Sequence, residues 1–154
     1  MQVTELLDKE GVDYEMREHR RTFTAQRMAA AEHEPGKCVA KPVVVKADGK
    51  YLMCVLGACY KVNLGALKSQ LGAENVELAE EEEIGKIFPD CELGAEPPFG
   101  NLLDLPTIID KAMEKDEYIV FEAGTHEKAV KMSMADYRRL VKPMVLDFSY
   151  HATS

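Results

Sequence analysis

Residues 38–57 read CVAKPVVVKADGKYLMCVLG, and this stretch sets the centre of the fold. Residues 38–47 are mostly apolar and rich in β-branched side chains, which is typical of a strand. Asp48-Gly49 is a two-residue turn signal, and residues 50–57 are apolar again. The sequence therefore predicts an antiparallel hairpin over residues 38–57.

The rest of the chain mixes short helical and strand-like segments around this hairpin. Hairpins combined with helices favour an α+β domain with a mixed, mainly antiparallel sheet that curls toward a barrel, with helices around it. No repeat or break in composition divides the 154 residues, so residues 1–154 are expected to form a single domain. The expected helices are 3–10, one capped by Thr22 or Thr24, 63–71, 79–88 and 133–141; the expected further strands are 14–19, 76–78, 107–112, 118–123, 128–132 and 144–148.

Lys41 is the unusual residue of the hairpin. Side chains alternate along a strand, so Lys41 shares its face with Val43 and Val45. An ammonium group there must reach solvent, form an ion pair or line a cavity, because burying an unpaired charge is costly. Two interpretations stay open: a lysine at the open edge of the sheet, which Pro42 favours, and a cavity lysine that anchors a phosphate or a carbonyl.

A stiff loop follows the helix expected at residues 79–88. It reads Gly-Ala-Glu-Pro-Pro-Phe-Gly over residues 94–100. Gly94 permits close approach of the backbone or a positive φ, and two successive prolines stiffen the loop. Such a loop can present backbone N–H groups to a developing oxyanion. Taken alone, the same residues also describe a tight surface turn.

Several other polar residues invite a functional interpretation. His126 follows the strand exit at Gly124 and is either a general base or an exposed loop residue. Asp110 is either a partner for a lysine or a turn cap. His33 lies between two glutamates but is interpreted as solvated surface, because adjacent helical residues point in different directions. His151 is expected in a C-terminal tail.

The four cysteines show no zinc-ligand spacing and are expected to be reduced thiols. A thiol or redox enzyme that uses Cys54 or Cys59 remains an alternative. No apolar run reaches the length of a membrane span, and the N-terminus lacks the pattern of a secretory signal. A cytoplasmic protein is therefore expected.

The charge of the chain is unevenly distributed. The net charge is −8, and residues 74–96 hold nine acids and one base, so this segment accounts for all of it. Phosphates would be repelled by these acids, so we expect the segment to face away from any bound nucleic acid. The candidate patch for phosphates consists of Arg17, Arg20, Arg21 and Arg27; a solvated charged edge is an equal alternative.

Taken together and in order, these segments resemble a known family. The resemblance rests on the strand that ends at His19, the Ala-Lys strand at Lys41, the helix over 63–71, the Gly-x-x-x-Pro-x-Gly loop over 94–100, Asp110, and the strand exit at Ala123-Gly124. This pattern resembles the YbaK/ProX-type aminoacyl-tRNA deacylases, also found as the editing insertion of bacterial prolyl-tRNA synthetases. The match covers nearly the whole chain, and Lys41 with the Gly94 loop is its most specific part.

The resemblance implies hydrolysis of the ester between a wrong amino acid and the tRNA 3′ end, with Cys- or Ala-tRNA(Pro) as expected substrates. It implies Lys41, Gly94 and His126 as catalytic residues, no cofactor and no metal. Its implied partners are a mischarged tRNA and a prolyl-tRNA synthetase, and neither DNA nor a membrane. A non-catalytic binding module of a synthetase is the alternative. The residues that the resemblance implies for substrate binding are Pro98, Gly100, Gly124, Asp110 and His19.

Two positions depart from the family pattern. Pro42 follows the lysine where a threonine or serine is common, and residues 56–58 read Leu-Gly-Ala where a proline is often found. Both positions belong to the hairpin that carries Lys41. The wall of the acyl pocket, and with it the preferred amino acid, is therefore expected to differ from that of other members.

Overall fold

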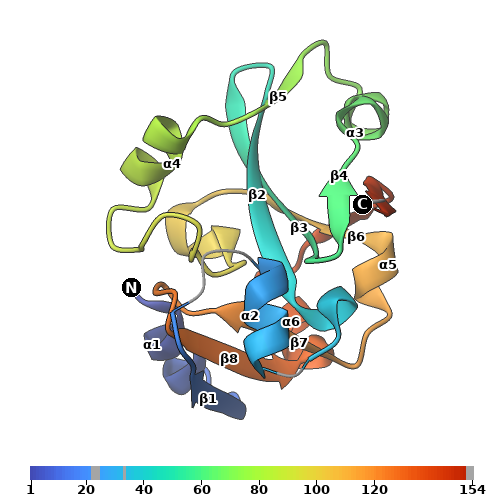
Figure 1. The fold of residues 1–154 in the computed structure, drawn as a ribbon. Coiled ribbons are helices and arrows are strands. Elements are labelled where there is room, and N and C mark those ends of the chain that lie inside the picture. Colours follow the sequence, from blue (N-terminus) through green and yellow to red (C-terminus); the bar gives the residue numbers. More distant parts are fainter. Residues whose placement is uncertain (22–24, 33, 152–154) are drawn as a thin grey trace.

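The computed structural model describes residues 1–21, 25–32 and 34–151. Figure 1 shows a long central hairpin with smaller strands and helices on both sides of it. The helices are α1 Val3–Lys9, α2 Ala25–Glu32, α3 Leu64–Leu71, α4 Glu81–Ile87, α5 Lys111–Glu114 and α6 Met134–Val141. The strands are β1 Tyr14–Glu18, β2 Ala40–Ala47, β3 Lys50–Gly57, β4 Tyr60–Val62, β5 Val76–Leu78, β6 Thr107–Asp110, β7 Tyr118–Glu122, β8 Lys128–Ser133, β9 Met144–Leu146 and β10 Ser149–His151.

The strands form three sheets. The largest has the order β5-β2-β3-β6-β9, the second β1-β8-β7, and β10 pairs with β4. Pairing is antiparallel except between β3 and β6 and between β6 and β9. A parallel bridge between Val39 and Val120 joins the second sheet to the first. The predicted α+β class with a mixed, mainly antiparallel sheet is confirmed, although the described strands do not close into a barrel.

The central hairpin agrees with its prediction. Residues 40–47 pair with residues 50–57 in register, so that Lys41 lies opposite Leu56. The first strand begins two residues later than expected, because Gly36–Cys38 forms a 3₁₀ turn. The alternation of side chains divides β2 between two cores: Val44 packs into a core with β7 and β8, whereas Val45 packs under α3.

Two local predictions were wrong, and one falls outside the described residues. The strand predicted over 107–112 ends at Asp110, because the Asp110 side chain accepts a hydrogen bond from the Ala112 N–H and starts α5. His151 lies in β10 rather than in a tail. The predicted caps Thr22 and Thr24 and the interpretation of His33 concern residues outside the described ranges.

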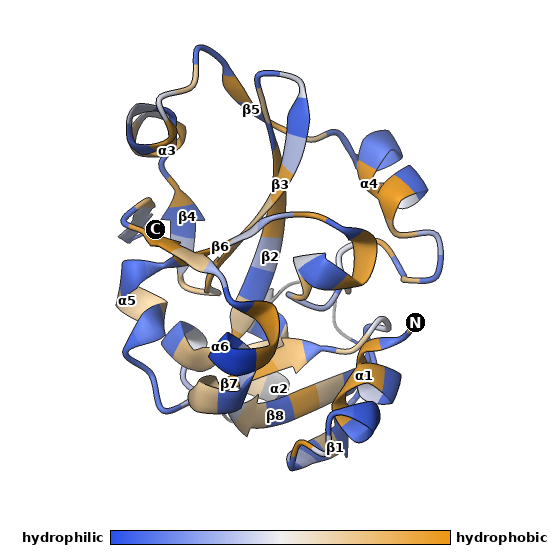
Figure 2. Cartoon of the chain, turned by 180° about the vertical axis from the view of Figure 1, so that it is seen from behind, coloured by the Kyte–Doolittle hydropathy of each residue, from blue (hydrophilic) through white to orange (hydrophobic). Residues whose placement is uncertain are grey.

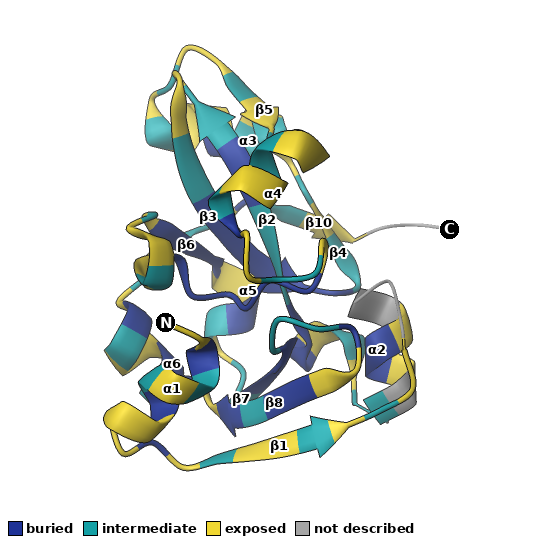
Figure 3. Cartoon of the chain, turned by 90° about the vertical axis from the view of Figure 1, so that its left-hand side faces the viewer, coloured by how far each residue is buried: buried dark blue, intermediate teal, exposed yellow. Residues whose placement is uncertain are grey.

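The buried strands lie at the meeting of the sheets. Figure 2 shows apolar colouring along β7 and β8 and on part of α4, and Figure 3 shows β7 and β8 as largely buried beside the more exposed β1. Phe121 and Tyr137 both contact Phe99, which brings the end of the Gly94 loop into the core. Among the described residues, no helix is long and apolar enough to cross a membrane.

Candidate functional site

The loop over residues 94–100 is anchored in the protein interior at its C-terminal end and exposed to solvent at its N-terminal end. Residues 95–100 are buried, whereas Gly94 is exposed with φ +86°. The Tyr137 hydroxyl donates a hydrogen bond to the Pro98 carbonyl, and the Gly100 N–H donates to the Thr107 hydroxyl at 3.1 Å. A Cβ on Gly100 would lie 2.4 Å from Thr107 Oγ1, so only glycine fits there. Pro98 and Gly100 therefore fix the loop from inside the protein.

The turn after β7 packs against the open end of this loop. The Gly124 N–H donates to the Ala95 carbonyl at 2.9 Å, and the Glu92 N–H donates to the Gly124 carbonyl at 2.8 Å. Gly124 has φ +91°, a conformation that glycine adopts without strain. Gly124 thus pairs with residues on both sides of Gly94 and sets the position of that residue.

His126 lies beneath Gly94 and is buried. Its Nε2 lies 2.7 Å from the Leu93 carbonyl, and because a carbonyl only accepts, Nε2 carries the proton. Its Nδ1 lies 3.5 Å from Glu122 Oε2. Burial raises the pKa of Glu122 to about 7, and the nearby imidazole opposes this shift. This arrangement supports Leu93 and Gly94 from below.

Gly94 and the free edge of β2 line one cavity of about 230 Å³, which we call the β2 cavity. Strand β5 pairs with residues 45–47 of β2, and the Ala79 N–H donates to the Val44 carbonyl at 3.0 Å, so residues 40–43 extend beyond the pairing with β5 along that edge. Most of the cavity wall is apolar, and two carboxylates are the charged groups on it. The lining residues are Pro42, Val43, Val44, Leu78, Ala79, Glu81, Ile84, Leu93, Gly94 and Glu96.

Glu96 is the buried polar residue of this cavity. Glu96 is 7% exposed, and its Oε2 has no hydrogen-bond partner among the described residues. Burial raises the pKa of Glu96, and the nearby backbone N–H groups of Gly94 and Ala95 offset this only in part. We expected the acidic segment to face away from the site, and this was wrong for Glu81 and Glu96.

Lys41 lies next to the cavity wall but is not among its lining residues. It is half-buried and shares its face of β2 with Val43, which does line the cavity. Burial lowers the pKa of Lys41, the like charge of Lys61 lowers it further, and Cys59 opposes the shift. Among the described residues, no carboxylate lies within ion-pair distance of Lys41 or Lys61. These two ammonium groups therefore form a small unneutralised positive site.

Asp110 and His19 lie elsewhere. The Asp110 carboxylate is buried and accepts hydrogen bonds from Ser149, from the Phe148 N–H and from the Ala112 N–H, so it joins α5 to the β9–β10 connection. In the sheet, β3 separates its strand from β2. The His19 N–H donates to the Glu127 carbonyl at 2.9 Å, which places His19 beside the 124–127 turn and outside the β2 cavity.

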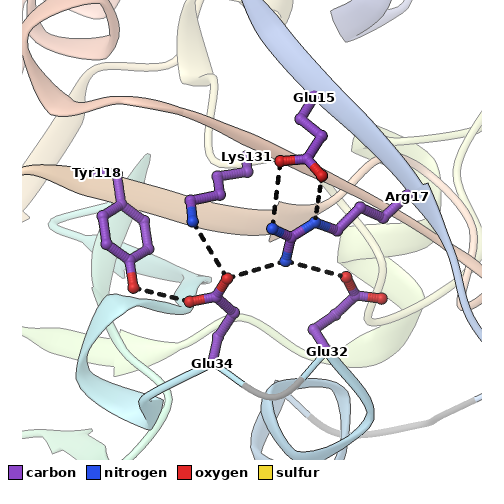
Figure 4. A network of polar contacts seen from close by, with 6 residues as sticks. All are labelled: Glu15, Arg17, Glu32, Glu34, Tyr118 and Lys131. Carbon is purple, nitrogen blue, oxygen red and sulfur yellow. Dashed lines mark hydrogen bonds and ion pairs between the residues drawn. The ribbon is translucent and has the colours of Figure 1, made fainter.

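The predicted arginine patch is largely neutralised. Figure 4 shows Arg17 between Glu15, Glu32 and Glu34, with Lys131 and Tyr118 on the same Glu34 carboxylate. Arg21 pairs with Glu92 and Glu127. These arginines therefore connect segments of the fold: Arg17 joins β1 to the chain after α2, and Arg21 joins β1's end to the Gly94 loop.

The environments of the cysteines do not favour a thiol enzyme. All four are free thiols. Cys54 is fully buried, and burial raises its pKa to about 12, so its reactive thiolate is scarce. Cys59 is partly exposed beside Lys41. No group of metal-ligating residues occurs among residues 1–21, 25–32 and 34–151.

A second cavity of about 100 Å³ lies between the N-terminus and the Gly94 loop. Met1, Cys91, Pro97 and Gly124 are among its lining residues, but neither Gly94 nor β2 takes part. The β2 cavity is therefore the one that joins the two segments singled out from the sequence.

Sequence reasoning missed two residues of the site, Glu96 and Glu122. A signal for Glu122 was present, because an acid directly after the apolar residues 119–121 must be buried, paired or at a strand end. Glu96 carried no such signal, since its neighbours are loop residues. Its burial follows from tertiary contacts of the loop.

Comparisons with known proteins agree with this geometry. The family model described as "Aminoacyl-tRNA editing domain" matches residues 19–140. The chain is 28% identical over 148 residues to the multifunctional Ser/Thr-tRNA deacylase ProXp-y of Escherichia coli (strain K12), covering 93% of this chain and 88% of that one. It is also 35% identical over 80 residues to the proline–tRNA ligase of Bacillus cytotoxicus, of which it covers 14%.

Solved structures share the fold. The crystal structure of hypothetical protein APE2540 superimposes with a TM-score of 0.87 at 18% identity, over 97% of this chain and all of that one. A candidate trans-editing enzyme for prolyl tRNA synthetase superimposes with a TM-score of 0.84 at 19% identity, over 96% and 94% of the two chains. The chain therefore belongs to the aminoacyl-tRNA editing domain family, and its enzyme class is that of the aminoacyl-tRNA deacylases.

Proposed function

We propose that this protein hydrolyses the ester of tRNA mischarged with a small amino acid, in trans. The observation that carries the proposal is that the Gly94 loop and the free edge of β2 line one cavity, and Lys41 directly precedes Pro42 of its wall. The acyl group would occupy the β2 cavity. The terminal nucleotide of the tRNA would extend over the edge of β2 toward Lys41.

The residues would divide the reaction between them. Lys41 and Lys61 would hold the phosphate or ribose of the terminal adenosine. A water molecule would attack the ester carbonyl carbon, and loop N–H groups at Gly94 would stabilise the oxyanion that forms. The ribose oxygen would then leave with a proton, giving free amino acid and intact tRNA. No protein nucleophile takes part in this scheme.

His126 would act as a positioning residue. It is buried, and its Nε2–H points at the Leu93 carbonyl rather than at the cavity. The Glu122–His126 contact would hold the backbone before Gly94 in the geometry that the oxyanion requires. This revises the catalytic role that the resemblance implies for His126.

The cavity favours small acyl groups. A volume of about 230 Å³ bordered by Pro42, Val43 and Ile84 suits side chains no larger than a few heavy atoms. We keep Cys- and Ala-tRNA(Pro) as the expected substrates. Ser- and Thr-tRNA are the competing substrates, because the Escherichia coli relative carries them in its name. A prolyl-tRNA synthetase is the proposed partner, since a ligase of that kind contains a similar segment.

The test is a deacylation panel with tRNAs charged with Cys, Ala, Ser, Thr and Pro. We expect multiple turnovers on at least one mischarged tRNA and none on Pro-tRNA(Pro). Lys41→Ala should lower kcat/KM at least 100-fold, whereas Lys50→Ala, which removes an exposed lysine at the hairpin turn, should leave it unchanged. Binding without turnover on every tRNA would instead favour the non-catalytic module.

A further inference from the structure

Glu96 is a buried carboxylate whose presence the hydrolysis scheme does not explain. It is 93% shielded from solvent, lines the β2 cavity, and has an oxygen without a hydrogen-bond partner among the described residues. Leaving a buried acceptor unsatisfied costs about 1–3 kcal/mol, and more for a charged group. Such a cost suggests a ligand group that satisfies the carboxylate when the cavity is occupied.

The surroundings of Glu96 define what this ligand group must be. The cavity wall is apolar apart from Glu81 and Glu96, and none of its lining residues is a cation. Two acids on one apolar wall attract a positive charge and repel a negative one. The ligand group is therefore a hydrogen-bond donor with a positive charge, attached to a small apolar body.

The aminoacyl ester of the proposed reaction carries one group of this kind. We propose that Glu96 binds the α-ammonium group of the acyl moiety, so that the cavity selects esters with a free amino group. This inference rests on the proposed function for the identity of the ester. It assigns Glu96 as a specificity-determining residue and gives a physical reason for an acid inside a tRNA site.

The position of Glu96 relative to the loop agrees with this assignment. The backbone N–H groups of Gly94 and Ala95 lie near its carboxylate. In an aminoacyl ester, the ammonium nitrogen is two bonds from the carbonyl carbon, and the carbonyl oxygen is one bond from it. A carbonyl held at Gly94 would therefore place the ammonium in the cavity that Glu96 also lines.

The test compares two esters that differ only in this group. Nitrous acid converts the amino group of Ala-tRNA to a hydroxyl, which gives lactyl-tRNA with the same ester and side-chain methyl. We expect the wild-type protein to prefer Ala-tRNA over lactyl-tRNA by about 100-fold in kcat/KM, because the hydroxyl lacks the charge. Glu96→Gln should reduce this ratio at least tenfold, and Glu96→Asp should restore part of it.

The control variant is Glu82→Gln. Glu82 lies on α4 with its side chain 79% exposed, so the variant removes one negative charge outside the cavity. Its ratio should equal that of the wild-type protein. Thermal unfolding of each variant checks that the fold is retained. An equal loss on both esters in Glu96→Gln would overturn the inference, because it would indicate a general base or a structural role.

A binding measurement separates this inference from the proposed hydrolysis. Its probes are 3′-alanylamino-3′-deoxyadenosine and the corresponding lactoyl amide, which have no ester to cleave. Calorimetry should show tighter binding of the alanyl compound to the wild-type protein, and equal binding of both to Glu96→Gln. This result with no turnover on any tRNA would reject hydrolysis and retain Glu96. Turnover on Ala-tRNA with no preference for the alanyl amide would retain hydrolysis and reject the role of Glu96.

Discussion

At the scale of single residues, the site depends on one exposed glycine above one buried histidine. Gly94 has a positive φ, and a Cβ there would lie 3.4 Å from His126 Cε1. L-residues adopt this backbone conformation at a cost of about 1–2 kcal/mol. A side chain at position 94 therefore strains the loop, while its Cβ would lie at van der Waals contact distance from the imidazole.

The first prediction concerns Gly94→Ala. We expect kcat/KM to fall at least tenfold, because the loop N–H groups move relative to the ester. The matched control is Gly49→Ala in the hairpin turn, where φ is +84° and nothing lies within 4 Å of the added Cβ. Both variants should lose about 1–2 kcal/mol of stability in urea unfolding. Equal activity in the two variants would remove Gly94 from the site.

The second prediction concerns the charge on Lys41. Burial lowers its pKa from the usual 10.5, so its positive charge is lost at lower pH than that of an exposed lysine. Binding of the lactoyl amide, which has no ammonium group of its own, should therefore weaken as the pH rises through this lowered pKa. In Lys41→Arg the guanidinium stays charged, and the alkaline loss should disappear. Calorimetric Kd values between pH 7 and 10 test this, and identical pH profiles for both proteins would contradict it.

At the scale of elements, the turn between β7 and β8 serves as a support for the Gly94 loop. It contributes Gly124 to the backbone hydrogen bonds and His126 to the contact with Leu93. Glu122, at the end of β7, completes the arrangement from inside. The loop is therefore positioned by a different part of the sequence from the one that forms the cavity wall.

The third prediction follows from the pKa of Glu122. This pKa is about 7 in the folded protein, against a usual 4.5, so the folded state binds the proton more tightly than the unfolded state. The stabilisation is complete below about pH 4.5 and is lost as the pH rises through about 7. We expect the wild-type protein to lose on the order of 2 kcal/mol between pH 5 and pH 8 from this group.

Glu122→Gln should flatten this pH dependence, because the amide does not ionise. Urea unfolding at pH 5 and pH 8 measures the difference. The control is Glu117→Gln, which changes an exposed acid just before β7 and should keep the wild-type slope. If Glu122→Gln loses as much stability between pH 5 and pH 8 as the wild-type protein, Glu122 is not the group responsible for the pH dependence.

The sequence predicted those elements whose local signals are strong. Asp48-Gly49, the Asn63 cap with Gly72, and the Ser133 cap all appear where expected. The prediction from sequence was wrong where one residue fits two local structures. Asp110 fits the end of an apolar strand in the sequence, but its side chain caps α5 in the fold. The strands β4 and β10 were missed; they form a separate two-stranded sheet, which is defined by a contact between segments distant in the sequence.

The chain segments that form the site were predictable from the sequence, but the burial and pairing of its charged side chains were not. Lys41 and Gly94 were found from residue type and spacing, and their segments line or adjoin one cavity. The burial of Glu96 and the pairing of Arg17 and Arg21 with carboxylates depend on contacts between distant segments. A single sequence does not show such contacts, so for the arginines both a phosphate patch and a solvated charged edge stayed open.

At the scale of the whole molecule, a net charge of −8 leaves few places for a polyanion. Lys41 and Lys61 form one such place, and the proposed contact involves only the end of the tRNA. With about two phosphates neutralised on a single strand, log K should fall with log salt at a slope of about −1.4.

The fourth prediction tests this small footprint. Binding of tRNA to the wild-type protein is measured between 50 and 200 mM salt, and Lys61→Ala should make the slope shallower by about 0.7. Lys50→Ala should leave the slope unchanged. A wild-type slope several times steeper would indicate a broad electrostatic surface and would contradict a contact confined to the tRNA end.

The pairing of β1 with β8 has a consequence for how the chain is made. Residues 14–18 can pair only after residues 128–132 have been synthesised. Strand β6 can pair with β9 only after residues 144–146 have been synthesised. On the ribosome, the hairpin of β2 and β3 can form early, but the sheets close only when nearly the whole chain has emerged. Contacts so distant in sequence slow folding. A nascent chain stalled before β8 would therefore present an unprotected β1, an open site for aggregation.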